Sequence, residues 1–214
     1  MELLNYMALV KYNNNSISDI TAAPNVGSGD MTLIKTLTAS GSSTLSFVHG
    51  SSDVVFDGTY PVYLFKFINI HPSGNNRFQF NASIDGGSNY NVSKTTTVWI
   101  AANREQGDDA TLTKQNSDDL SVSTSFQDLM AYGNQGADND HNLNGTMHFF
   151  SPSNTTFWKN FIARTVHTGQ DDYAVHNFVT GHFRDNDDDI NAVRFQMNSG
   201  TFDGTIKLYG LKDS

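Results

Sequence analysis

Residues 60–90 show the clearest alternation of apolar and polar positions in the chain. Over residues 78–84, Phe, Phe, Ala and Ile alternate with polar residues, and the run stops at Asp85, which begins an Asp-Gly-Gly turn. A period of two places the apolar residues on one face of a half-buried strand. The preceding run, residues 62–70, is apolar at nearly every position, which predicts a strand buried on both faces. The short polar turn between the two runs predicts that they pair as a long antiparallel hairpin.

The same strand pattern recurs along the whole chain, with turn-forming residues between the runs. It predicts an all-β fold, an antiparallel β-sandwich of jelly-roll type with about ten strands, because two Greek keys accommodate this number. Residues 103–119 are expected to form a polar loop, and residues 125–132 one short helical turn. The expected strands are residues 31–39, 44–49, 60–70, 78–84, 95–101, 120–124, 146–150, 156–167, 173–182, 192–197 and 205–209.

The domain organisation follows from where this pattern begins. Residues 1–30 are weakly patterned and are expected to form an N-terminal extended arm, with a short strand at 8–12. No linker divides residues 31–214, which predicts a single jelly-roll β-sandwich domain. Since weakly hydrophobic segments often order only on binding, we expect residues 7–30 to pack against a neighbouring subunit.

Composition restricts the partners. The chain has no cysteine, so disulfides and thiolate chemistry are excluded. Of its 22 acidic residues, 20 are aspartate, a residue that favours turns, and the net charge is −9. Most of that charge falls after residue 100, which predicts acidic loops that repel phosphate, so nucleic acid is not an expected partner. No secretion signal and no apolar run long enough for a membrane span are visible.

Catalytic chemistry is not indicated. Jelly-roll enzymes that cleave polysaccharides need two facing carboxylates, yet Glu2 and Glu105 are the only glutamates, and we interpret Asp85 as a turn former. Nucleotide-binding and serine-nucleophile motifs are absent. The sequence therefore predicts a protein that is not an enzyme, with no catalytic residues and no cofactor.

Three groups of residues are candidate metal ligands. His176 and His182 are six residues apart and should share one face of a strand, but they lack a third ligand. Two acidic clusters, residues 138–140 and 185–189, could bind calcium, but neither has the spacing of an EF-hand loop. Solvated turns are the favoured interpretation of both clusters, the second being the better calcium candidate. No metal site is predicted.

The two tryptophans lie in apolar runs, Trp99 in TTTVWIAA and Trp158 in TTFWKNFIA. We interpret both as strand interiors, which favours a role in the core or in an interface. Stacking on a carbohydrate is the alternative.

Several segments resemble one protein family. MALVKYNNNSISDITA (residues 7–22), LIKTLTASGSSTLSFVHG (33–50) and the ending GTIKLYGLKDS resemble β-rich virion structural proteins of tailed phages of marine bacteria, notably cyanobacterial phages. The resemblance covers nearly the whole chain and includes YPVYLFKFINIHP, FQFNASIDGGSNYNV, TSFQDLM and FFSPSNTTFWKNFIAR. The family pattern starts at MALVKY, so Met7 is an alternative translation start to Met1.

The resemblance implies a jelly-roll module in the virion, made in the host cytoplasm, that docks onto other virion proteins and forms a homo-oligomer. Capsid-surface decoration or a knob is favoured over a tail or fibre component, because the chain lacks the coiled-coil heptads of a shaft. The alternative function is a carbohydrate-binding module that contacts host surface glycans. Trp99 and Trp158 discriminate between the two, since indoles in a sugar site are quenched by sugar and buried indoles are not.

Overall fold

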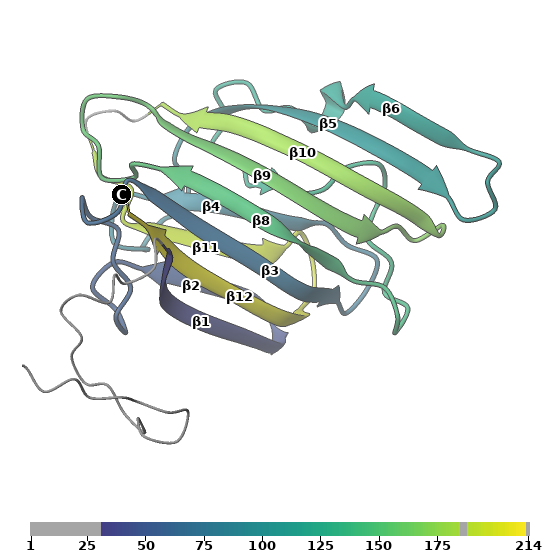
Figure 1. The fold of residues 1–214 in the computed structure, drawn as a ribbon, viewed down its shortest axis with the longest axis horizontal. Helices are drawn as coiled ribbons and strands as arrows, with labels where there is room; N and C mark the ends of the chain where they lie inside the picture. Colours follow the sequence, from purple (N-terminus) through teal and green to yellow (C-terminus); the bar gives the residue numbers. More distant parts are fainter. Residues whose placement is uncertain (1–30, 185–187, 213–214) are drawn as a thin grey trace, which may run out of the picture.

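The computed structural model describes residues 31–184 and 188–212, which form two antiparallel β-sheets packed as a sandwich (Figure 1). The all-β sandwich predicted from the alternating pattern is confirmed. The expected arm, residues 1–30, lies outside the described residues. The elements are β1 (Met31–Ser42), β2 (Thr44–Val48), β3 (Val62–Pro72), β4 (Phe78–Ser83), β5 (Lys94–Arg104), β6 (Ala110–Lys114), the 3-10 helix η1 (Asn116–Asp118), β7 (Gln127–Asp128), β8 (Leu143–Phe150), β9 (Lys159–Thr168), β10 (Tyr173–Phe183), β11 (Ala192–Met197) and β12 (Phe202–Leu211).

The two sheets differ in width. The larger has eight strands in the order β1-β12-β3-β8-β9-β10-β5-β6, and the smaller has four in the order β2-β11-β4-β7. Sequence neighbours such as β1 and β2, β3 and β4, and β11 and β12 lie in opposite sheets, so the chain crosses the sandwich repeatedly. This order is consistent with the jelly roll expected from the sequence. Strands β9, β10, β5 and β6 widen the larger sheet on one side (Figure 1).

The hairpin predicted between residues 62–70 and 78–84 is wrong. β3 pairs with β12 and β8, whereas β4 pairs with β11 and β7 in the other sheet. The turn between them passes from one sheet to the other, which alternation within each strand could not reveal. β3 is also not buried on both faces: Phe65 and Phe67 are buried on the inner side, but Ile68 on the other side is 36% exposed.

Aromatic side chains fill the space between the sheets. The ring of Phe195 on β11 lies edge-on to Phe65 and Phe67 on β3, with ring centroids 5.1 and 5.2 Å apart. On its own sheet it stacks with Phe78 on β4 at 5.9 Å. Edge-to-face and offset pairs of this kind add to the free energy gained by burying the rings. The alternating apolar positions of β4 thus face the core, as predicted.

A covering segment, residues 120–142, packs over the inner face of the wider half of the larger sheet. The Thr165 hydroxyl on β9 donates to the Leu129 carbonyl at 2.6 Å, and the Ala131 amide donates to the Asn177 side-chain oxygen on β10 at 2.9 Å. Leu129 and Met130 are fully buried. The helical turn predicted at 125–132 is wrong, since these residues contain the two-residue strand β7 and hydrogen-bond to strand side chains instead.

Two further local predictions are wrong. The polar loop expected at 103–119 contains β6, which pairs with β5 at the edge of the described sheet. Its alternating exposed and half-buried residues leave little hydrophobic pattern to detect. The strand expected at 120–124 makes only a single bridge between Ser123 and Lys94. The backbone of residues 120–124 instead hydrogen-bonds to β5 and so joins the covering segment to that strand.

The turn after β4 matches its prediction. The Asp85 carboxylate accepts hydrogen bonds from the Ser83 hydroxyl at 2.7 Å and from the Asn89 amide at 2.8 Å. These bonds close the turn and lower the pKa of Asp85 to about 2. Asp85 therefore forms the turn that the sequence indicated.

Candidate functional site

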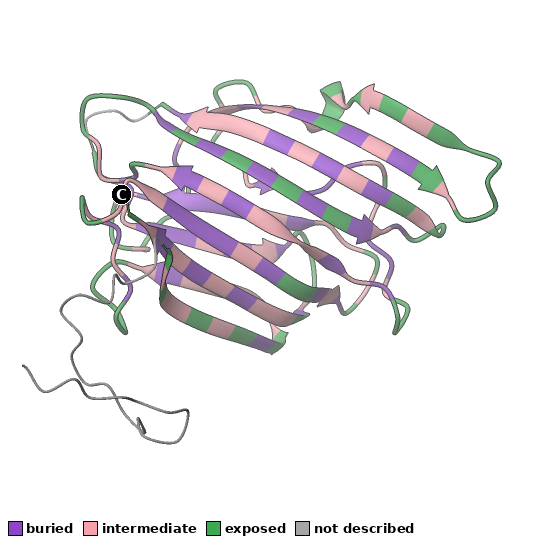
Figure 2. Cartoon of the chain, viewed as in Figure 1, coloured by how far each residue is buried: buried purple, intermediate pink, exposed green. Residues whose placement is uncertain are grey.

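The outer face, defined as the side of the larger sheet that points away from the smaller one, carries most of the exposed large apolar side chains of the described residues. Figure 2 shows exposed and buried positions alternating along β9, and since successive side chains point to opposite faces of a strand, one face of β9 is open to solvent. Contiguous apolar patches mark binding surfaces, whereas single exposed apolar residues are normal, so the neighbours of each residue decide its significance. The exposed members on its strands are Met31, Leu33, Ile68, Trp99, Leu112, Ile162 and Val166.

The same sheet has an unusual charge distribution for an acidic protein. Its eight strands contain one acidic residue, Asp203 on β12. The cations on the outer face are Lys66, Lys114, Arg164 and Lys207. Most acidic residues of the described chain lie in the loops, so the molecule combines acidic ends with a basic outer face.

Trp99 lies on the outer face of β5 and is 47% exposed, so a core role for it is wrong. Its cross-strand neighbour on β10 is Phe178, and the Arg164 guanidinium lies over the Phe178 ring at 4.8 Å. Val98 and Ile100, on either side of Trp99 in sequence, point inward and are fully buried. Trp99 thus forms part of an exposed surface of aromatic and cationic groups.

Trp158 immediately precedes β9 and is 48% exposed, so the core alternative is wrong for it too, and the interface alternative stays a prediction. Its indole stacks on the imidazole of His182, with centroids 4.6 Å apart and planes 9° from parallel. The Arg184 guanidinium lies 5.9 Å from the indole. His182 also lines a depression of about 280 Å³ on the outer face, together with Thr95, Thr96, Thr97, Asn160, Thr180 and Gly181.

A second apolar area, the docking patch, lies at the opposite side of the outer face. The strand register places Leu33, Tyr209 and Leu64 side by side on β1, β12 and β3. The next row of the patch contains Met31, Leu211 and Val62. Met31 and Leu33 are 43% and 51% exposed. The docking patch therefore continues to the edge strand β1.

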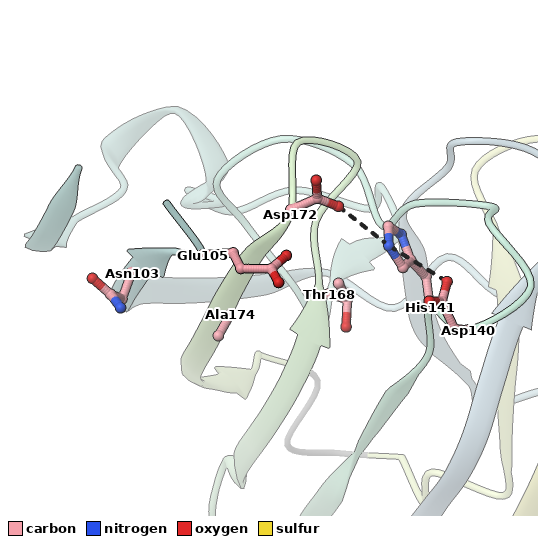
Figure 3. A pocket seen from close by; sticks show the side chains of 7 residues that line it. All are labelled: Asn103, Glu105, Asp140, His141, Thr168, Asp172 and Ala174. Carbon is pink, nitrogen blue, oxygen red and sulfur yellow. Dashed lines mark ion pairs between the residues drawn. The ribbon is translucent and has the colours of Figure 1, made fainter. Parts of the chain in front are cut away.

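An acidic hollow of about 410 Å³ lies where the loops after β5 and β9 meet residues 138–141 (Figure 3). Nε2 of the largely buried His141 lies 3.5 Å from an Asp172 oxygen and 3.8 Å from an Asp140 oxygen. Glu105, which the sequence places in the polar loop 103–119, lines the same hollow. Its negative charge favours cations and hydrogen-bond donors over anions. The remaining lining residues are Asn103, Thr168 and Ala174.

The structure separates the residues considered as metal ligands. His176 and His182 share the outer face of β10, as predicted, but six residues of strand place them about 20 Å apart. Asp138 and Asp140 flank a turn in which the His141 amide donates to the Asp138 carbonyl. Within residues 31–184 and 188–212, no group of three or more His, Asp or Glu side chains is placed to bind a metal. Residues 185–187 of the second acidic cluster lie outside the described residues.

No family model, curated protein or solved structure matches this chain. In the part of the chain that the structure describes, no helix is long and apolar enough to cross a bilayer.

Proposed function

We propose that this chain is a non-enzymatic structural protein of a phage virion, which docks onto neighbouring virion proteins and onto copies of itself. The resemblance of its motifs to β-rich virion proteins supports this function. The strand order supports it as well, since we infer from it a jelly roll in which the hairpins β5–β6 and β9–β10 widen one sheet. Capsid-surface decoration or a knob is the leading location, with a tail or fibre component as the alternative.

The docking patch is the observation that carries this proposal. Leu33 and Tyr209 lie side by side on β1 and β12, next to the buried Leu64 on β3, and Met31 and Leu33 are about half exposed. Burying apolar area stabilises a complex by roughly 25 cal/mol per Å². Burial of this patch against a neighbouring protein would therefore favour docking.

The edge strand next to the patch offers a second mode of contact. β1 is twelve residues long, and among the described residues its only partner in the sheet is β12, so it forms an edge of the described sheet. An unpaired edge of this length is a template for further strand pairing. Patch and edge together fit a subunit of a larger assembly.

Purified particles of a phage that carries the gene provide the test. Leu33→Asp places a charge in the docking patch, whereas Leu112→Asp makes the same change at an exposed position on β6, at the far end of the sheet. Quantitative mass spectrometry against the major shell protein should find wild type and Leu112→Asp in particles and Leu33→Asp depleted. Both variants should keep the wild-type melting temperature as free proteins.

The copy number separates the two locations. A number comparable to the shell protein would support capsid decoration, and a few copies per particle would support a tail or fibre role. Absence of the wild-type protein from particles would overturn the virion proposal. Normal incorporation of Leu33→Asp would overturn the role of the docking patch.

A carbohydrate-binding module is the second candidate, and the two exposed indoles favour it. Trp158 stacks on His182 at the margin of a depression lined by threonine and asparagine side chains, which supply hydrogen-bonding groups for sugar hydroxyls. Titration with oligosaccharides from the host surface should quench the indole fluorescence of the protein. Unchanged fluorescence and no heat of binding would reject this second function.

A further inference from the structure

One register row crosses most of the larger sheet on its outer face. Cross-strand pairing aligns six residues from β12 to β5, and Lys114 on β6 continues the row beyond Trp99. Residues directly opposite one another point to the same face, so the side chains run in a line across the strands. With strands about 4.8 Å apart, the six residues span about 24 Å, and Lys114 extends the line to about 29 Å. This cationic row consists of Lys207, Lys66, Thr146, Arg164, Phe178 and Trp99.

Three cations of this row have no ion-pair partner among the described residues, unlike Lys114 at the end of the line, which pairs with Asp119. Lys66 and Lys207 are direct cross-strand neighbours, an arrangement of like charges that destabilises a sheet. Among the described residues, no carboxylate lies within 4 Å of Lys66, Lys207 or Arg164. An anionic ligand along the row would relieve this repulsion.

The aromatic members of the row add flat apolar surface. Trp99 lies beside Phe178, and the Arg164 guanidinium covers the Phe178 ring at 4.8 Å. On the other side of Arg164, Thr146 contributes a hydroxyl. A ligand that fits must therefore present ring faces and hydroxyls as well as negative charges along one line.

We propose that the cationic row binds a linear polysaccharide that carries carboxylate or sulfate groups, lying across the strands. Sugar rings offer an apolar face to Trp99, and their acidic groups reach Lys66, Lys207 and Arg164. Single-stranded nucleic acid fits less well, because its phosphate on every nucleotide is denser than these cations and the net charge of −9 opposes it. The inference rests on the carbohydrate-binding function proposed above and adds the ligand class and its direction.

Calorimetric titration of the full chain tests the proposal with three probes of equal length: alginate oligomers, heparin oligomers and neutral cello-oligomers. The alginate and heparin oligomers should bind, and their affinity should fall as salt is raised. Arg164→Ala and Lys66→Ala should each weaken binding about tenfold, the effect of losing one charged hydrogen bond. Lys212→Ala removes the same charge from an exposed position beyond β12 and should leave the affinity unchanged.

Each result that differs from this expectation would reject a different part of the proposal. Binding of the neutral oligomer alone, lost in Trp158→Ala, would keep the carbohydrate function and reject the cationic row. Binding of none of the three probes would reject both. Equal affinity in Arg164→Ala and Lys212→Ala would show that anions bind elsewhere. Tighter binding of oligo-dT than of alginate, dependent on Arg164, would overturn the ligand class.

Discussion

The side-chain nitrogen of Lys94 donates a hydrogen bond of 2.8 Å to the amide oxygen of Asn81, and neither side chain is exposed to solvent. The same ammonium donates to the carbonyls of Ser125 at 2.5 Å and Val92 at 3.4 Å. These bonds link β5 to β4 and to the covering segment. Burial away from water lowers the pKa of Lys94 to about 7.

Stability should consequently rise with pH above neutrality. Between about pH 7 and the ordinary lysine value near 10.4, folded Lys94 is neutral while the unfolded chain still binds the proton. Each pH unit in that window should add up to about 1.4 kcal/mol to the free energy of unfolding. Urea denaturation at pH 7, 8 and 9 should show this slope in wild type and not in Lys94→Met.

Lys212→Met, at an exposed lysine, serves as the control and should keep the wild-type slope. The same slope in Lys94→Met and wild type would show that Lys94 remains protonated in its buried position.

Ionisation of Asp85 should make the stability of the fold depend on pH at the acidic end of the range. Because hydrogen bonds from Ser83 and Asn89 lower its folded pKa to about 2, the carboxylate contributes stability that is present above pH 4 and lost as pH falls through 2. Asp85→Asn should melt at a lower temperature than wild type at pH 7. The difference should shrink between pH 4 and pH 2.

Asp53→Asn changes another exposed loop aspartate and should leave the melting temperature unchanged. A hydrolase activity that disappears in Asp85→Asn would contradict the interpretation of Asp85 as a turn former.

The local structure around Asp85 could be predicted because the signals are local. Alternation in β4 places Phe78 and Phe80 inward, and an aspartate before two glycines ends the strand. Trp99 could have been placed by the same reasoning, since Val98 and Ile100 occupy the inward positions on either side of it. The run around Trp99 is apolar on both faces, so its composition favours the core or an interface, and only the period of two separates these alternatives.

The cationic row could not be predicted from the sequence. Lys66, Arg164 and Trp99 are far apart in the chain, and their alignment depends on which strands are neighbours and in what register. The wrong β3–β4 hairpin has the same origin, because strands adjacent in sequence lie in different sheets. Alternation identifies the face of a residue within its own strand and says nothing of its cross-strand partners.

Close packing of β10 against β5 makes Gly181 sensitive to substitution. A Cβ atom at this position would lie 2.5 Å from the Thr95 carbonyl oxygen and 2.8 Å from a Thr96 methyl group. Gly181→Ala should therefore destabilise the fold by about 1–3 kcal/mol, the typical cost of overpacking. Gly58→Ala adds the same methyl group where no atom lies within 4 Å and should be nearly neutral in urea denaturation. Equal free energies of unfolding for the two variants would mean that β5 and β10 can move apart to admit the methyl group without loss of stability.

The two indoles can report which part of the outer face is covered in the virion. Trp99 and Trp158 are each about half exposed, so acrylamide should quench the fluorescence of both in the isolated protein. The variants Trp99→Phe and Trp158→Phe each retain one indole and so allow each to be measured separately. If assembly uses the docking patch on β1, β12 and β3, acrylamide should quench both indoles as strongly in purified particles as in the isolated protein. A fluorinated tryptophan incorporated into this protein alone distinguishes its indoles from those of other virion proteins. Protection of Trp99 on assembly would show that virion proteins cover the wider half of the sheet, and the cationic row would then be unavailable to a polysaccharide.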